Sequence, residues 1–393
     1  MKMGIFFIFL TFSVIFIAFM TNNINEYMGN SLDLKEINSD TNNYTINMTT
    51  TINNMIPINN KYILACEYKP NIYFHNLYLT NKIDNEKLYL INTENNEYEE
   101  ILLKDYPENI PFHPQSMSLY IKNNNSILYI LNHAVSYNYE GKERIEKFNI
   151  RFESKKVELI FEEGIILPQE YFLRIQSISI INENLFYFST NSPYETSRNS
   201  DEPFKSKLYH KKNELLKIIN PMLKMKKCFI YLYNKENKDI SVIDGSQSYI
   251  YGGITYDNKR NLLYAIKSIE KEMNIFEINE KGAKLIKTIQ LLYVGNNIFY
   301  DNNKDKLYIG INGKKGEEES IIKKIKANEE YENIEIFSGY EIINPGNNFS
   351  INDIMVMKNN NYKWINTAIE IKGKIYMSSI YSKGIFVCDK NNL

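Results

Sequence analysis

One short pattern of polar and apolar positions recurs along the chain: a polar turn, an aliphatic or aromatic residue, a tyrosine and a further apolar residue. Its six copies are Leu77-Tyr78-Leu79, Leu128-Tyr129-Ile130, Phe186-Tyr187-Phe188, Leu263-Tyr264-Ala265, Leu307-Tyr308-Ile309 and Ile375-Tyr376-Met377. Their tyrosines are 51, 58, 77, 44 and 68 residues apart, which suits four-stranded blades with loops of unequal length. The pattern predicts an all-β fold, a six-bladed β-propeller. Tyrosine is abundant, however, and the further pair Leu88-Tyr89 shows that some copies can arise by chance.

The segments around these copies alternate between apolar and polar residues, as in residues 178–181 and 273–278. Asparagine, aspartate and glycine separate the apolar runs, which is typical of strands joined by turns. Asparagine replaces glycine as the main turn former, because it tolerates a left-handed backbone and closes turns with its own side chain. Helix is scarce: the stretch from His210 to Lys227 is amphipathic and is interrupted by Pro221. It predicts one or two short helices on top of the propeller, with a membrane-binding surface as the alternative.

The N-terminus carries an apolar run over residues 4–20, preceded by Lys2. Residues 1–20 are therefore expected to be a signal peptide or a signal anchor, which would associate the chain with a membrane or with lipid. Residues 21–60 are polar and rich in Asn and Thr, which predicts a linker, and residues 61–393 are assigned to the propeller. We expect the secretory pathway, with the protein either extracellular or membrane-anchored and facing the lumen. Glycosylation sequons fit this route and occur at Asn43, Asn47, Asn124 and Asn348.

Composition narrows the possible partners. The 46 Lys and Arg residues nearly balance the 47 Asp and Glu residues, giving a net charge of −1, and 44% of the residues are hydrophobic. The chain therefore has enough apolar material for a folded core and no overall attraction to nucleic acid. We expect no nucleic-acid partner.

Candidate chemistry is limited by what the sequence lacks. It contains no G-x-S-x-G, H-E-x-x-H or glycine-rich phosphate-binding motif, and it has only four histidines. The three cysteines, Cys66, Cys228 and Cys388, are too few for a zinc site. In an oxidising compartment, Cys66 and Cys388 would be able to form a bridge joining the two ends of the fold. The alternative is three unrelated thiols in the core.

Four motifs occur in an order that resembles the paraoxonase/arylesterase family. They are residues 112–118 (FHPQSMS), residues 131–133 (LNH), residues 188–191 (FSTN) and residues 375–388, which end in Cys388. The resemblance extends from about Cys66 to Cys388. It implies a six-bladed propeller closed by a Cys66–Cys388 disulfide. It also implies calcium-dependent hydrolysis of lactones and aryl esters, in which a calcium ion in the central tunnel polarises the carbonyl group.

The ligand positions implied by this resemblance are only partly kept. Asn191, Asn296 and Asn297 match positions of the family's calcium ligands, whereas Gly252 stands where an asparagine is expected. The expected Glu-Asp pair has no clear counterpart, and Glu67 is a weak replacement.

Of the two family histidines that handle the proton, one is matched by His133 and the other is replaced by Gln115. Calcium affinity increases with the number of carboxylate ligands, so we expect weak calcium binding and reduced or absent hydrolysis. Two hypotheses follow. In the first, the protein is a working esterase or lactonase in which Glu67, His133 and the three asparagines converge. In the second, it is a non-catalytic propeller that serves as a binding scaffold.

Overall fold

The computed structural model describes residues 43–69, 85–123, 125–133, 143–153, 156–167, 174–192, 226–279, 282–313, 324, 336–359 and 362–389. The predicted leader and all of the predicted helical stretch except Lys226 and Lys227 lie outside these residues, and these two lysines have no regular secondary structure. In the described part of the chain, helical geometry is limited to residue 324 and a 3₁₀ turn, η4, at Pro345–Asn347. No helix there is long and apolar enough to cross a membrane.

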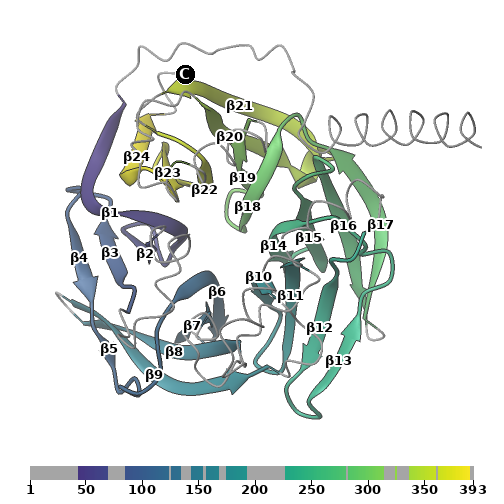
Figure 1. Ribbon diagram of the computed structural model, residues 1–393, viewed down its shortest axis with the longest axis horizontal. Helices are drawn as coiled ribbons and strands as arrows, with labels where there is room; N and C mark the ends of the chain where they lie inside the picture. The colour runs from purple at the N-terminus through teal and green to yellow at the C-terminus, as the bar shows by residue number, and fades with distance from the viewer. Residues whose placement is uncertain are drawn as a thin grey trace, which may run out of the picture.

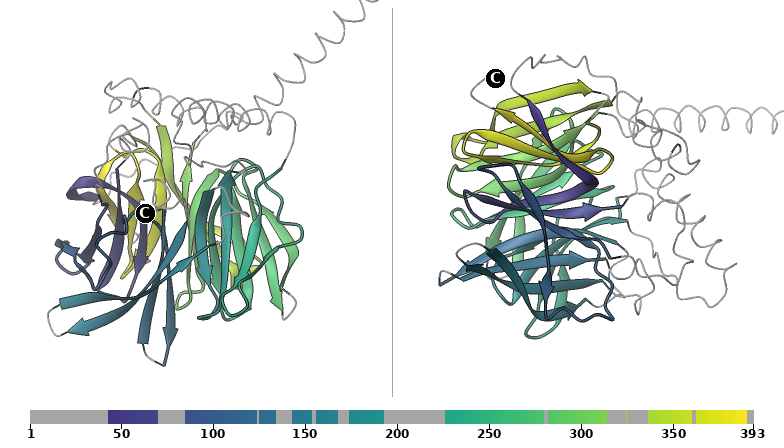
Figure 2. Two further views of the ribbon diagram at one scale, coloured as in Figure 1. Left: turned by 60° about the horizontal axis from the view of Figure 1, so that its bottom comes forward. Right: turned by 90° about the vertical axis from the view of Figure 1, so that its left-hand side faces the viewer.

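The described residues form an all-β fold whose sheets are arranged around one axis as in a propeller (Figure 1, Figure 2). Three sheets have four strands in sequence order. The first comprises β10 (Arg174–Ile180), β11 (Leu185–Ser192), β12 (Ile230–Asn234) and β13 (Asp239–Val242). The second comprises β14 (Tyr251–Asp257), β15 (Leu262–Lys267), β16 (Glu272–Asn279) and β17 (Gly282–Gln290). The third comprises β18 (Val294–Asp301), β19 (Lys306–Asn312), β20 (Ile336–Asn344) and β21 (Ser350–Asn359).

A fourth sheet has five strands, because a short segment joins its outer edge in parallel. Its members are β6 (Pro114–Lys122), β7 (Asn125–Asn132), β8 (Arg144–Glu153), β9 (Lys156–Ile166) and the added β5 (Leu103–Lys104). These four sheets are separate blades, and each of them is a sheet of its own in the hydrogen-bond pattern.

The remaining sheet has seven strands, and β1 lies in its middle. In order, the strands are β22 (Ile365–Ile371), β23 (Lys374–Ser379), β24 (Lys383–Asp389), β1 (Tyr44–Pro57), β2 (Tyr62–Tyr68), β3 (Leu88–Asn92) and β4 (Tyr98–Ile101). The first half of β1, from Tyr44 to Thr51, pairs with β24, and the second half, from Thr51 to Pro57, pairs with β2. The first described strand of the chain therefore pairs with the last one, β24, as well as with the next one, β2.

This strand corrects the predicted domain boundary. The linker was expected to extend to residue 60, but Tyr44–Pro57 is a strand of the fold, so this boundary is wrong. The physical reason is a period-two pattern hidden in a polar stretch: Ile46 and Met48 are buried, whereas Asn47 and Thr49 between them are exposed. Ile46 and Met48 pack with Ile385 and Val387 of β24.

The recurrent tyrosine pattern marks one structural position. Five of the six predicted tyrosines are buried in the second strand of a sheet, and they are Tyr129, Tyr187, Tyr264, Tyr308 and Tyr376. The first predicted copy, residues 77–79, lies outside the described residues. Turns follow the expectation for asparagine: eleven non-glycine residues have a positive φ in the part of the chain that the structure describes, and four of them are Asn96, Asn123, Asn261 and Asn348.

The structure does not show the predicted disulfide. Cys66, Cys228 and Cys388 are free, buried thiols, and Cys66 and Cys388 belong to different hydrophobic clusters. Cys66 pairs with Asn54 of β1, whereas Cys388 follows Val387, which pairs with Tyr44. About ten residues of β1 separate these positions, whereas a disulfide requires Cα atoms about 4–7 Å apart.

Candidate functional site

The inner strands of the sheets form a closed ring around the axis, each in contact with the next: β6, β10, β14, β18, β22 and the second half of β1 (Figure 1). Each of these strands has an irregular register near the same end. The residues that the paired register skips at these irregularities share a chemical character, being amides or glycines: Asn53, Gln115, Gln176, Gly252, Gly253, Asn296, Asn297 and Asn366. β-Bulges of this kind redirect backbone and side chains, and here they occur at equivalent places around the axis.

Hydrogen bonds connect these positions from strand to strand. The Asn53 side-chain amide donates to the Gln115 Oε1 atom at 2.9 Å, and Asn366 donates to the Asn53 Oδ1 atom at 2.6 Å. Asn297 donates to the Thr367 hydroxyl at 3.3 Å, and Asn296 donates to the backbone carbonyl of Ile365 at 3.2 Å. The axial amides are therefore largely satisfied by one another and by neighbouring backbone.

On the other side of the axis, serine hydroxyls continue this chain of hydrogen bonds, and the amides and hydroxyls together are called the axial belt below. The Ser116 and Ser177 hydroxyls lie 3.3 Å apart, and the Ser177 hydroxyl accepts from the Ile254 backbone amide at 3.2 Å. Ser189 donates to the Gly252 carbonyl at 3.2 Å. The belt of hydroxyls and amides thus links β6, β10, β11 and β14.

Glycine at positions 252 and 253 follows from the close approach of β14 to β18. A Cβ atom on Gly252 would lie 2.3 Å from the Asn296 carbonyl oxygen, and one on Gly253 would lie 2.7 Å from the Ile298 nitrogen. The asparagine that the family resemblance leads one to expect at Gly252 therefore has no room in this backbone.

Two other residues predicted as calcium ligands, Asn191 and Glu67, have hydrogen-bond partners other than the bonded axial amides Asn53, Gln115 and Asn366. Asn191 is the penultimate residue of β11 and donates to the Gln176 Oε1 atom at 2.6 Å, while its own Oδ1 atom is buried without a hydrogen-bond partner among the described residues. Glu67 is buried on β2, and its carboxylate accepts from the Lys87 backbone amide at 3.0 Å and lies 3.7 Å from the Lys69 ammonium group. The Glu67 carboxylate is thus bonded where β2 ends and β3 begins, whereas Asn296 and Asn297 lie at the axis.

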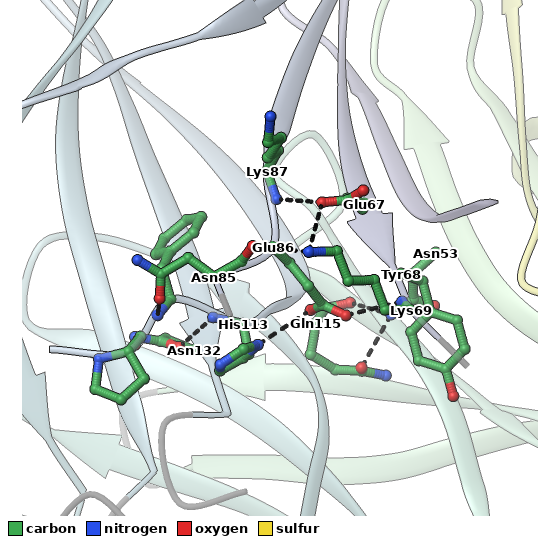
Figure 3. A network of polar contacts seen from close by, with 12 residues as sticks. Asn53, Glu67, Tyr68, Lys69, Asn85, Glu86, Lys87, His113, Gln115 and Asn132 are labelled. Carbon is green, nitrogen blue, oxygen red and sulfur yellow. Dashed lines mark hydrogen bonds and ion pairs between the residues drawn. The ribbon is translucent and has the colours of Figure 1, made fainter. Parts of the chain in front are cut away.

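Beside the axial ring, the fully buried His113 lies between the seven-stranded and the five-stranded sheet, next to Glu86 and Lys69 (Figure 3). Its Nδ1 atom is 3.5 Å from the Glu86 carboxylate, whose other oxygen accepts from the Lys69 backbone amide at 2.9 Å. Burial, together with the nearby His133 and Lys69, holds the pKa of His113 well below its usual value. The imidazole is therefore neutral at physiological pH, and the cluster joins the end of β2 to the start of β6.

His133 follows β7 and has a carboxylate partner of its own. Its Nδ1 atom is 2.7 Å from the Glu143 Oε2 atom, and only 1% of His133 is exposed. Its backbone amide donates to the His113 carbonyl at 2.9 Å, which places the two histidines side by side. The preceding Asn132 accepts from the His113 backbone amide and donates to the buried Glu146 carboxylate.

The donor set at the axis does not fit a tightly held calcium ion. Calcium takes six to eight oxygens and binds tightly only where several are carboxylates. The residues that the register skips at the bulges are neutral, and Asn53, Gln115 and Asn366 already bond one another. Across the residues that the structure describes, no three His, Cys, Asp or Glu side chains gather as a metal site would require.

Sequence reasoning missed Asn53 and Asn366, although a signal for both was present. Ile52-Asn53-Asn54-Met55 repeats the arrangement of Gly295-Asn296-Asn297-Ile298, with two amides directly before an apolar residue of the same strand. Ile365-Asn366-Thr367-Ala368 is a third version. Aligning these segments with one another would have identified the axial position without a structure.

The fold and site define a β-propeller with a polar axial ring and a histidine–carboxylate pair beside it. A family model for arylesterases matches residues 39–325, and the chain belongs to this arylesterase family. No curated protein matches the sequence.

Several solved structures are similar to this chain at low sequence identity. A luciferin-regenerating enzyme has 7% identity and a TM-score of 0.46, with 88% of this chain and 94% of that one covered. A chain of a nidogen/laminin complex has 9% identity and a TM-score of 0.43, with 78% and 86% covered. A functionally unknown protein from Desulfotomaculum acetoxidans has 10% identity and a TM-score of 0.38, with 87% and 90% covered.

Proposed function

We propose that this protein is a six-bladed arylesterase-family propeller that hydrolyses esters or lactones weakly and without a catalytic calcium ion. The observation that carries the proposal is the axial ring, in which amides and glycines occupy the skipped positions and the amides bond to one another, to a hydroxyl and to neighbouring backbone. Neutral groups that are already paired provide little attraction for a divalent cation. Hydrolysis then depends on a positioned base, and His133 is the candidate.

The count of six blades treats the seven-stranded sheet as two blades that share β1. Residues 44–51 of β1 provide the outer strand of a blade with β22, β23 and β24. Residues 51–57 provide the inner strand of the next blade, with β2, β3 and β4. The register change within β1 and the closed ring of inner strands support this division.

The proposal includes entry into the secretory pathway, with residues 4–20 as signal peptide or anchor. Among the sequons, Asn47 and Asn348 are exposed, which is the condition for glycosylation. Expression in a secreting eukaryotic host, followed by glycosidase treatment and N-terminal sequencing, tests this part. Protein that stays unglycosylated and retains a cytosolic location would contradict it.

A second candidate function is a non-catalytic binding scaffold, favoured by the same hydrogen-bonded axial belt, because side chains used for closing the ring are not free for chemistry. One assay separates the two functions. Hydrolysis of phenyl acetate and of a simple lactone is measured with calcium and with a chelator, for the wild type and His133→Ala. The proposal predicts slow turnover that the chelator leaves unchanged and H133A removes.

Loss of turnover on chelation would contradict the calcium-free mechanism. Equal rates for the wild type and H133A, both at the level of buffer, would contradict hydrolysis and leave the scaffold function.

A further inference from the structure

The contact between His133 and Glu143 joins two neighbouring strands just beyond their paired ends. Asn132 and Arg144 are the last paired positions of β7 and β8, so the next residue on each strand, His133 and Glu143, faces its neighbour directly. The Nδ1–Oε2 distance of 2.7 Å is that of a charge-assisted hydrogen bond. Both side chains are buried, which strengthens such a bond relative to one exposed to water.

A carboxylate can only accept, so the proton of this bond lies on the imidazole nitrogen. In a neutral imidazole, one nitrogen carries the proton and the other carries the lone pair. Nδ1–H therefore donates to Glu143, and Nε2 is left as the accepting atom. Nε2 is buried and has no hydrogen-bond partner among the described residues.

The charged groups around the pair contact other residues. Arg144 donates to the Glu146 carboxylate at 2.7 Å, and that carboxylate also accepts from Asn132. His113 lies against a different carboxylate, Glu86. Glu143 thus contacts His133, whereas His113 lies against Glu86, so the two histidines have different carboxylate partners.

We propose that Glu143 is a positioning residue for His133, fixing the tautomer in which the Nε2 lone pair acts as the base of ester hydrolysis. This inference rests on the proposed function. In the reaction, the oxygen of water bonds to the carbonyl carbon while Nε2 accepts the water proton. The carbon–oxygen bond to the leaving group then breaks, and the leaving oxygen takes the proton from the imidazolium, so the base is restored.

The test uses the full chain labelled with ¹⁵N at histidine, in the wild type, Glu143→Gln, Glu143→Ala and His133→Ala. Long-range proton–nitrogen spectra distinguish the protonated from the unprotonated ring nitrogen, and signals missing in H133A identify His133. The wild type is expected to show Nδ1–H and an unprotonated Nε2. In E143A the two tautomers are expected to mix, because no carboxylate holds the Nδ1 proton.

Steady-state hydrolysis of phenyl acetate gives the second readout. E143A is expected to lower kcat by about 10-fold or more with little change in KM, as part of the roughly 10²–10⁴-fold factor that a positioned base supplies. E143Q keeps an acceptor oxygen and should retain more activity than E143A. The matched control is Glu153→Gln at the exposed far end of β8, which should behave as the wild type.

A wild-type spectrum with the proton on Nε2 overturns the inference whatever the activity. So does an E143A variant that keeps both the tautomer and kcat of the wild type. Absence of hydrolysis in the wild type overturns the proposed function and the role of Nε2 as base, whereas the spectrum still decides whether Glu143 positions His133.

Discussion

The strand that closes the ring can be tested at Ile46. This residue lies in the part of the chain that reads as a linker, yet its side chain is buried against Ile385 and Val387 of β24. Replacing Ile46 with Ala removes three carbons from a packed site and leaves a cavity. Substitutions of this kind at buried sites cost about 2–5 kcal/mol. We expect I46A to lower the free energy of unfolding by that amount.

The matched control is Thr49→Ala, three residues further along the same strand and exposed. A surface change of this kind is expected to alter stability by less than about 0.5 kcal/mol. Urea unfolding followed by circular dichroism measures both variants, and calorimetry replaces it if unfolding is irreversible. Equal effects of I46A and T49A would refute the account, because residues 44–50 would then not pack as a strand on β24.

Three further predictions concern buried groups. Glu341 is fully buried without a side-chain partner among the described residues, and burial raises its pKa to about 7. The folded state therefore holds a proton that the unfolded chain releases, and stability falls by about 3 kcal/mol as pH rises from about 4.5 to about 7. Glu341→Gln should remove this loss in denaturant titrations at pH 5 and pH 8, whereas exposed Glu99→Gln should keep it. Gly252→Ala should cost about 1–3 kcal/mol by calorimetry, because its Cβ would meet the Asn296 carbonyl oxygen; an unchanged melting temperature would refute that close approach. Protein denatured without reductant should titrate three thiols with Ellman's reagent, and a single thiol would reveal a disulfide.

Much of the fold could be predicted because its signal is local. Tyr129, Tyr187 and the later tyrosines occupy the second strand of each sheet, where apolar neighbours on both sides make the strand recognisable. All of β1 was missed, because it lies within a stretch dominated by Asn and Thr, and only Ile46 and Met48 mark its first half. Its strand character depends on β24, more than 300 residues away in sequence, and no local pattern encodes that partner.

The site could be predicted only in part, for a similar reason. Short sequence motifs identify His133 and Asn297 as candidate site residues. Whether a residue faces the axis, however, depends on where each inner strand bulges. Glu143 lies ten residues after His133, and their contact arises from the β7–β8 register. The Cys66–Cys388 bridge was inferred by resemblance, and the register of β1 places the two thiols at different positions.

Calorimetry with calcium on the purified full chain decides whether the axial ring holds a metal ion. The account predicts no binding heat at millimolar calcium and the same melting temperature with calcium as with chelator, because the axial groups are neutral and bonded to one another. A site with a dissociation constant of about 10 μM would stabilise the fold by about 2.7 kcal/mol at 1 mM calcium. Binding of that strength, lost on Asn297→Ala, would contradict the account.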